Sequence, residues 1–192
     1  LSPNDVVVLN NTKVFPARLL GRADTGAAIE IFLVEEMSPL TWLCLARPAR
    51  RLKTGKRIVF SDRLSAEVSE KRPDGRVVVN FTAAGDFYAL VDEAGRTPLP
   101  PYIKRGAIDI DADRERYQTV YASKSGAIAA PTAGLHFTPD VLERVGNTGA
   151  EIAEVTLHVG YGTFEPVRVT DLSEHSVAAE RFEISDDTAK IL

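Results

Sequence analysis

The chain has 192 residues with a formal net charge of −4 at pH 7, and 44% of the residues are hydrophobic. This composition can bury a core and so excludes a disordered chain, while the acidic balance requires that any nucleic-acid binding come from a local basic patch. The single cysteine, Cys44, excludes an internal disulfide, and no apolar run is long enough to span a membrane, so we expect a cytoplasmic protein that contacts no membrane.

The first predicted element is the apolar run Val6–Leu9, which ends abruptly in Asn10, Asn11 and Thr12. A short run that is apolar on both faces is typical of a strand in a covered, parallel sheet. Polar residues at the carboxyl end of such a strand lie where open α/β sheets bind ligands. The opening of the chain therefore predicts an α/β domain with a ligand site at this strand end.

Short β-type runs without intervening helices fill the chain from about Arg18 to Phe81. Asp74 and Gly75 within "RPDGR" predict a hairpin turn, because both residues tolerate positive φ. About five such strands indicate a small barrel or sandwich. We expect an α/β domain, with a mixed sheet and helices, at residues 1–17 and 96–192, interrupted by an inserted β-barrel domain at residues 18–95. The chain opens at Leu1 and stops within "DDTAKIL", so we expect a piece that is truncated at both ends.

Helical and extended patterns alternate in the remainder of the chain. A helix is predicted from Asp86 to Arg96 with its end at Gly95, and the proline-rich "TPLPPYIKRG" is expected to be extended. The segment "DADRERYQTVYASKSG" is helical in its first half and strand-like in its second. The segment "EIAEVTLHVGYGTF" alternates as a strand does. Its two faces carry Val155, Leu157 and Val159 on one side, and Glu154, Thr156 and His158 on the other.

The segment "APTAGLHFTPDVLERVG" predicts a helix that Thr138 caps and Gly146 ends. Thr132, Gly134 and His136 precede it, where unpaired backbone N–H groups at a helix start favour anions and developing negative charge. His136 can serve there as an acid or a base near neutral pH. The alternative is an ordinary helix lead-in with a partly buried histidine.

Two further patterns carry weaker signals. Gly160 and Gly162 after the strand resemble a phosphate loop, but they lack a third glycine and a Walker lysine, so two glycines that shape a tight loop explain them as well. His136, His158 and His175 lie 22 and 17 residues apart without a thiolate companion, which argues against zinc. No metal is expected.

Basic and aromatic residues could contact RNA. The segment "RPARRLKTGKR" holds six bases and no acid, which indicates either a phosphate-binding footprint or a solvated loop. These bases are Arg47, Arg50, Arg51, Lys53, Lys56 and Arg57. Aromatics among bases can stack on nucleobases or simply pack in the core. They are Tyr102, Tyr117 and Tyr121 beside Lys104, Arg105, Arg114 and Arg116.

Five segments in chain order resemble one family closely: "VVLNNTKVFPARL", "PLPPYI", "RYQTVYA", "AAPTAGLHFT" and "VTLHVGYGTFEPV". The family is the S-adenosylmethionine:tRNA ribosyltransferase-isomerases of the queuosine pathway. The resemblance implies an α/β domain with an inserted β-barrel. It also implies transfer and isomerisation of the ribosyl part of S-adenosylmethionine onto the 7-aminomethyl-7-deazaguanine (preQ1) base in a tRNA anticodon loop. Epoxyqueuosine in tRNA is then the product, and adenine and methionine are released.

The resemblance also implies the partners and the roles of residues. S-adenosylmethionine is a consumed substrate, no other cofactor is implied, and we expect a monomer. The sulfonium acidifies the C5′ protons, so a base is needed, with His136 as first candidate, His158 as second, and Thr132 as a further catalytic residue. The expected substrate-binding residues are Asn10, Thr12, Arg18, Tyr102, Tyr117, Gly134, Gly160, Gly162, Thr163, His175 and Glu180. The six bases listed above, with Lys104 and Arg105, are expected to bind tRNA.

One position departs from the family pattern, since Ala178 stands where a second histidine is expected three residues after His175. A catalytically impaired tRNA-binding homologue is therefore the alternative function. A methyltransferase would need a glycine-rich loop after the first strand, and "VVVLNNTKVF" has none.

Overall fold

The computed structural model describes residues 1–100, 103, 110–164, 167, 169–174 and 178–192. The chain forms two compact units. One consists of Leu1–Phe15 with Leu99–Leu192, and the other is Pro16–Pro98. The first unit has mixed sheets with helices and the second is a β-barrel, which confirms the predicted fold class.

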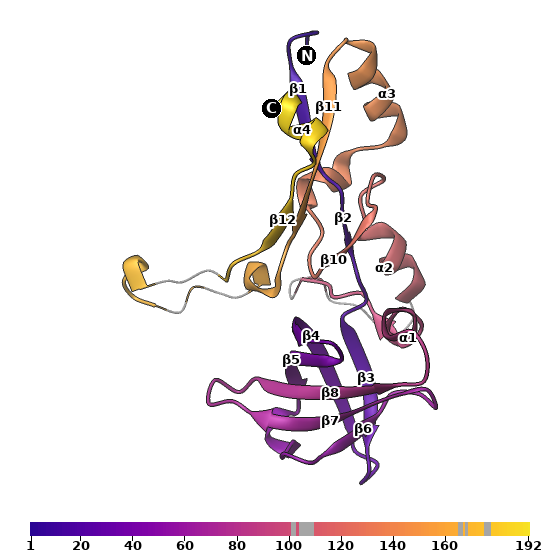
Figure 1. Ribbon diagram of the computed structural model, residues 1–192, viewed down its shortest axis with the longest axis vertical. Helices are drawn as coiled ribbons and strands as arrows, with labels where there is room; N and C mark the ends of the chain where they lie inside the picture. The colour runs from indigo at the N-terminus through magenta and orange to yellow at the C-terminus, as the bar shows by residue number, and fades with distance from the viewer. Residues whose placement is uncertain (101–102, 104–109, 165–166, 168, 175–177) are drawn as a thin grey trace. The chain divides into compact units, whose positions relative to one another are not determined.

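The barrel unit closes six antiparallel strands into a ring (Figure 1). The strands are β3 (Arg18–Ala23), β4 (Ala28–Ser38), β5 (Thr41–Arg47), β6 (Arg57–Val59), β7 (Leu64–Lys71) and β8 (Val77–Ala83). They pair in the order β4-β5-β8-β7-β6-β3, and the β3–β4 pair closes the ring. Closure removes the unpaired edges that an open sheet of these strands would expose. The short strand β9 (Gly95–Arg96) also pairs with β3, and the 3-10 helix η1 (Ala49–Arg51) follows β5.

Alternating side chains fill the barrel interior. Leu19, Ile31 and Val79 are fully buried, as the period of two along each strand requires. Cys44 is buried as well, and this burial raises the pKa of its thiol, so it packs as a small hydrophobic residue. The predicted hairpin joins β7 to β8 with Gly75 at a φ of 88°, which confirms the turn.

Helix α1 (Phe87–Ala94) belongs to the barrel unit and is shorter than predicted. Asp86 caps its first turn by accepting a hydrogen bond from the Ala89 backbone N–H. Gly95 is its C-cap, which confirms the predicted helix end, and Gly95 and Arg96 form β9.

Two small sheets form the frame of the α/β unit. Strand β1 (Val6–Asn10) runs parallel to β11 (Glu151–His158), and β12 (Arg181–Glu183) is antiparallel to β11 (Figure 1). Strand β2 (Thr12–Val14) runs parallel to β10 (Lys124–Ala127). The helices are α2 (Ile110–Arg116), α3 (Pro139–Asn147) and α4 (Asp186–Ile191), and the 3-10 helices are η2 (Thr132–His136), η3 (Tyr161–Phe164) and η4 (Leu172–Glu174).

Two local predictions in this unit are wrong. Strand β1 is parallel, as predicted, but it is not covered on both faces, since Val6 and Val8 are 38% and 46% exposed while Leu9 is buried. A continuous apolar run in the sequence does not indicate which face of the strand is covered by other parts of the protein. Helix α3 begins at its Thr138 cap as predicted but continues through Gly146, because the left-handed turn is made by Gly149 with a φ of 81°.

None of the helices formed by the described residues is long and apolar enough to cross a membrane.

Candidate active site

Asn10, at the end of β1, is bound to the backbone of β11. Its amide nitrogen donates to the Leu157 carbonyl, and its carbonyl oxygen accepts from the Leu157 N–H, both at 2.9 Å. The same oxygen accepts from the Thr12 backbone N–H at 3.2 Å. The Asn10 side chain therefore extends the hydrogen bonding between β1 and β11 beyond the last backbone pair. Its bond to the Thr12 N–H also fixes the start of β2.

Asn11 contacts the polar face of β11. Its amide donates to the Glu154 carboxylate at 2.8 Å, and its carbonyl oxygen accepts from the Thr156 hydroxyl at 2.7 Å. Asn11 and Thr156 are 7% and 5% exposed, so these bonds satisfy groups that water does not reach. Glu154 and Thr156, which the sequence places on the polar face of this strand, are thus hydrogen-bonded to Asn11, the residue that follows β1.

His158, the last residue of β11, is half-buried and contacts Thr12. Its Nδ1 lies 2.8 Å from the Thr12 hydroxyl oxygen. Burial lowers the pKa of His158, and the positive charge of Arg181 on β12 lowers it further, while Glu183 opposes both. The imidazole is therefore biased toward its neutral form at pH 7, in which one ring nitrogen can accept a proton.

Gly126, on β10, leaves room for this imidazole. A β-carbon at this position would lie 2.7 Å from both Nδ1 and Cε1 of His158, closer than real side chains approach. Its φ of 152° is also a conformation that side chains rarely adopt. The ring of His158 is thus held between the Thr12 hydroxyl and the backbone of residue 126.

Thr132, Gly134 and His136 form their own 3-10 helix, η2. The Gly134 N–H donates to the Pro131 carbonyl and the Phe137 N–H to the Gly134 carbonyl. The α3 start lies beyond, where Thr138 caps the Val141 N–H. The three residues directly precede the helix start, as predicted, and η2 bonds the Gly134 N–H internally, while their contact with a ligand stays a prediction.

Gly134 is buried beneath the side chain of Tyr121. A β-carbon at 134 would collide with the Tyr121 hydroxyl and come within 2.8 Å of Cγ2 of Thr119. Burial raises the pKa of Tyr121, and its ring makes an edge contact with Phe137 at 6.3 Å between ring centroids. Tyr121 and Gly134 thus fix η2 against the segment that leads to β10. His136, by contrast, is exposed, and none of the hydrogen bonds recorded among the described residues involves its side chain.

A pocket of about 610 Å³ lies in the α/β unit. Its wall is mostly apolar, with hydroxyls from Thr132 and Thr163 and the buried Tyr117. The complete lining is Pro100, Tyr117, Ala129, Ala130, Pro131, Thr132, Val159, Thr163 and Phe164. Val159 directly follows His158 in the chain, but consecutive side chains along a strand point to opposite faces, and His158 is not among the residues that line the pocket. An apolar pocket with a few polar groups is the usual form of a small-molecule site.

The loop that contains Gly160 and Gly162 contacts the segment before β12. The Gly160 N–H donates to the Glu180 carboxylate at 2.8 Å. A β-carbon at 162 would lie 3.7 Å from the Ala178 methyl group, an ordinary van der Waals distance. Two of the predicted substrate-binding residues, Gly160 and Glu180, are thus bonded to each other, and Ala178, where the sequence resemblance led us to expect a histidine, is adjacent to the loop.

Arg18 and the predicted tRNA-binding residues 47–57 belong to the barrel unit. Arg18 pairs with Glu30 at 2.7 Å, and Lys56 pairs with Asp24. Arg47, Arg50, Lys53 and Arg57 are exposed, and no ion pair is recorded for them among the described residues. The backbone of Arg51 lies in η1. Tyr102, Lys104, Arg105 and His175 lie outside the described residues.

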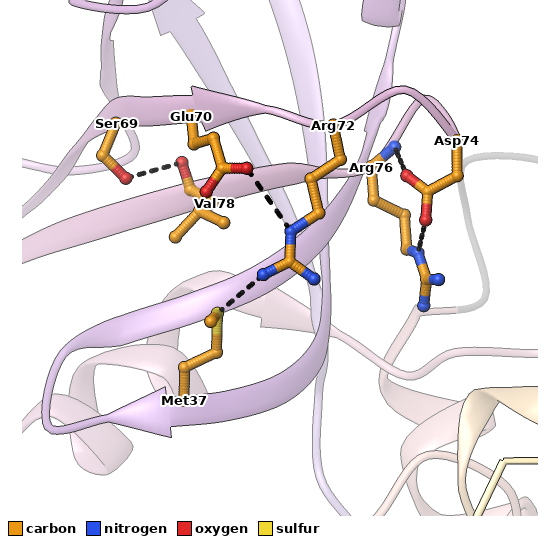
Figure 2. Close-up of polar contacts among 7 residues, drawn as sticks. All are labelled: Met37, Ser69, Glu70, Arg72, Asp74, Arg76 and Val78. Carbon is orange, nitrogen blue, oxygen red and sulfur yellow. Dashed lines mark hydrogen bonds and ion pairs between the residues drawn. The ribbon is translucent and has the colours of Figure 1, made fainter.

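Arg72 and Arg76, in the 72–76 hairpin, differ from the exposed basic residues of 47–57 because each pairs with an acidic residue (Figure 2). Arg76 bonds Asp74 at 2.6 Å through Nε, and Arg72 lies 3.8 Å from Glu70 with its guanidinium also near the Met37 sulfur. The hydrogen bond from the Arg76 backbone N–H, and then the one from the Arg76 side chain, lower the pKa of Asp74.

Gly126 was not predicted from the sequence, and Tyr121 was not assigned to the site. The segment "KSGA" gives no sign that Gly126 packs against the imidazole of His158, because the two residues lie 32 positions apart in the sequence. The described residues contain no group of three His, Cys, Asp or Glu side chains that could hold a metal ion.

Together these units and contacts define an α/β protein with an additional barrel, a group of polar residues that contacts His158, and a pocket in the α/β unit. A family model described as "Queuosine biosynthesis protein" matches residues 1–192, and the chain belongs to that family.

Curated relatives of the chain share one name, S-adenosylmethionine:tRNA ribosyltransferase-isomerase. The proteins of Trichlorobacter lovleyi and Thermotoga petrophila are 47% and 46% identical over 98% and 100% of this chain. The protein of Citrifermentans bemidjiense is 49% identical over 97% of the chain. The chain spans only 54–55% of the length of these relatives.

Proposed function

We propose that this protein transfers and isomerises the ribosyl moiety of S-adenosylmethionine onto the preQ1 base of a tRNA anticodon loop. The products are epoxyqueuosine in tRNA, adenine and methionine. The observation that carries the proposal is family membership over all 192 residues, together with relatives of that name at 46–49% identity. S-adenosylmethionine is consumed as a substrate, and no further cofactor takes part.

The reaction needs a base beside the sulfonium, because the positive sulfur acidifies the protons of C5′. We propose His158 for this role, although the sequence alone ranks His136 first. His158 is half-buried, bonded to Thr12 and shifted toward its neutral form, whereas the His136 side chain is exposed. General-base catalysis contributes about 10²–10⁴ in rate, and a positioned neutral imidazole suits it.

The pocket of the α/β unit is proposed to bind part of S-adenosylmethionine. Its walls offer apolar contact from Val159 and Phe164, and hydroxyls from Thr132 and Thr163. Thr132 thus acts as a lining residue.

The exposed bases Arg47, Arg50, Lys53 and Arg57 are proposed to contact tRNA phosphates. Among the described residues no carboxylate pairs with them, so binding a phosphate breaks no ion pair of the barrel. Such contacts are sequence-independent and weaken as salt increases.

The test is turnover by the full-length gene product with S-adenosylmethionine and tRNA that carries preQ1. We expect free adenine to accumulate in step with a ribosyl-derived mass gain on the nucleoside, and neither product with tRNA that lacks preQ1. Adenine release without a change in nucleoside mass would contradict ribosyl transfer.

A second candidate, a tRNA-binding homologue with impaired catalysis, is favoured by one observation. Ala178 lies beside Gly162 in the loop after β11, where the sequence resemblance led us to expect a histidine. Tight tRNA binding without adenine release would support this candidate, and Ala178→His would then be expected to restore turnover.

A further inference from the structure

Three groups from three strands form a chain of hydrogen bonds in the α/β unit. Nδ1 of His158 on β11 lies 2.8 Å from the hydroxyl oxygen of Thr12 on β2. The same hydroxyl lies 3.5 Å from the backbone carbonyl oxygen of Lys124 on β10. Thr12 and Lys124 are also direct partners in the parallel β2–β10 pair, so the backbone fixes this arrangement.

One arrangement of the protons makes both contacts hydrogen bonds. A carbonyl oxygen can only accept, so in that arrangement the single hydroxyl proton of Thr12 points to Lys124. The Thr12 oxygen must then accept from the imidazole, which requires a proton on Nδ1 of His158. In the neutral imidazole this leaves Nε2 without a proton.

We infer that Thr12 is a positioning residue that holds neutral His158 with its proton on Nδ1, so that Nε2 is free to accept a proton from substrate. The base role of Nε2 rests on the proposed function, but the position of the proton does not. The Thr12 hydroxyl is thereby assigned to the histidine rather than to the substrate, although the sequence analysis expects Thr12 to bind substrate.

The surroundings of the ring support this assignment. Thr12 is 0% exposed, so water does not compete for its hydroxyl. Gly126 allows the His158 ring to approach Thr12, because a β-carbon at residue 126 would collide with Nδ1. The charged groups that act on the imidazole are Arg181 and Glu183, both from β12.

The resulting proton transfers balance. Nε2 takes one C5′ proton, and the electron pair of that C–H bond stays on the carbon beside the sulfonium. The imidazolium then carries protons on both nitrogens, and Nδ1 keeps its bond to Thr12. Nε2 gives its proton to the departing adenine, which returns His158 to the starting tautomer.

The first test is the ¹⁵N spectrum of the His158 ring in the protein without substrates, near pH 8. We expect a protonated, pyrrole-type Nδ1 and an unprotonated, pyridine-type Nε2. A protonated Nε2 would overturn the inference. Thr12→Ser keeps the hydroxyl and should keep this pattern, while the isosteric Thr12→Val should lose it. An unchanged spectrum in Thr12→Val would also overturn the inference.

The second test separates positioning from substrate binding. Thr12→Val should lower kcat for adenine release by about tenfold or more while KM for S-adenosylmethionine stays within about twofold, because the loss falls on base catalysis. Thr12→Ser should recover most of kcat, and Thr82→Val, an exposed threonine on β8, should change neither constant. A raised KM with an unchanged kcat would instead assign Thr12 to a substrate hydroxyl. If the unsubstituted protein releases no adenine, the proposed function fails, while the ¹⁵N spectrum still decides the tautomer.

Discussion

The imidazole of His158 rests on the backbone of Gly126, and a β-carbon at residue 126 would come within 2.7 Å of two ring atoms. Residues 126 and 158 lie on β10 and β11, so two different sheets meet at this contact. The chain has thirteen glycines, and this one is required by the proposed base rather than by a turn.

Gly126→Ala should therefore impair catalysis, and the φ of 152° adds a backbone cost to folding. The added methyl group displaces the ring from Thr12, so we expect adenine release to fall by about tenfold or more, within the range that general-base loss allows. Gly146→Ala is the matched control, because no atom lies within 4 Å of its β-carbon and alanine favours helix α3 by about 0.5–1 kcal/mol. Equal activity in the two variants would show that the ring position does not matter.

Gly134→Ala should destabilise the α/β unit. Its methyl group collides with the Tyr121 hydroxyl, and overpacking of this kind costs about 1–3 kcal/mol in the free energy of unfolding. Tyr121→Phe removes the colliding oxygen, so the double variant should regain part of the loss. Urea unfolding of the four proteins measures the coupling, and strictly additive effects would contradict the contact.

Stability should depend on pH through His158. Its pKa is lowered in the folded protein, so the unfolded chain binds more protons once the pH falls below about 6.5, the ordinary value. The free energy of unfolding should accordingly decrease as the pH falls from 7 through this window, and less steeply in His158→Gln. Chemical unfolding at several pH values measures both slopes. A steeper decrease in His158→Gln would mean that the folded protein favours the charged imidazole.

Asn10→Ala should weaken the junction between β1 and β11. The substitution leaves the N–H and carbonyl of half-buried Leu157 without their partner, and unsatisfied groups cost about 1–3 kcal/mol. Asn80→Ala, on an exposed position of β8, should change the free energy of unfolding by less than about 0.5 kcal/mol. A similar small change for both would show that water replaces the Asn10 amide without loss.

The exposed bases of the barrel should differ from its paired arginines in tRNA binding. Arg47→Gln with Arg50→Gln should weaken binding and reduce the salt slope by about one for each phosphate that is no longer bound. Arg72→Gln with Arg76→Gln removes the same charge from residues that Glu70 and Asp74 already neutralise (Figure 2), so it should have a smaller effect. Equal losses of affinity in the two double variants would indicate a general charge effect instead of a footprint.

Local signals made much of the fold predictable. The Asp74-Gly75 turn, the Thr138 cap and the run of strands each depend on residues close in sequence, and all three were confirmed. The exposed face of β1 and the internally bonded η2 were not predictable, because burial and 3-10 bonding depend on what packs against the segment. The ligand site expected at the polar strand end stays a prediction, and the structure shows that polar residues follow the strand. Their contacts with Glu154, Thr156 and His158, more than 140 positions away, required the parallel β1–β11 register.

The most direct test of the proposed site compares His158→Gln with His136→Gln in the adenine-release assay on preQ1-containing tRNA. We predict that His158→Gln loses about 10²–10⁴ in kcat, as removal of a general base does, while His136→Gln stays within about threefold of the unsubstituted protein. The opposite result, with His136→Gln inactive and His158→Gln near normal, would contradict the proposed site and restore the exposed histidine of η2 as the base.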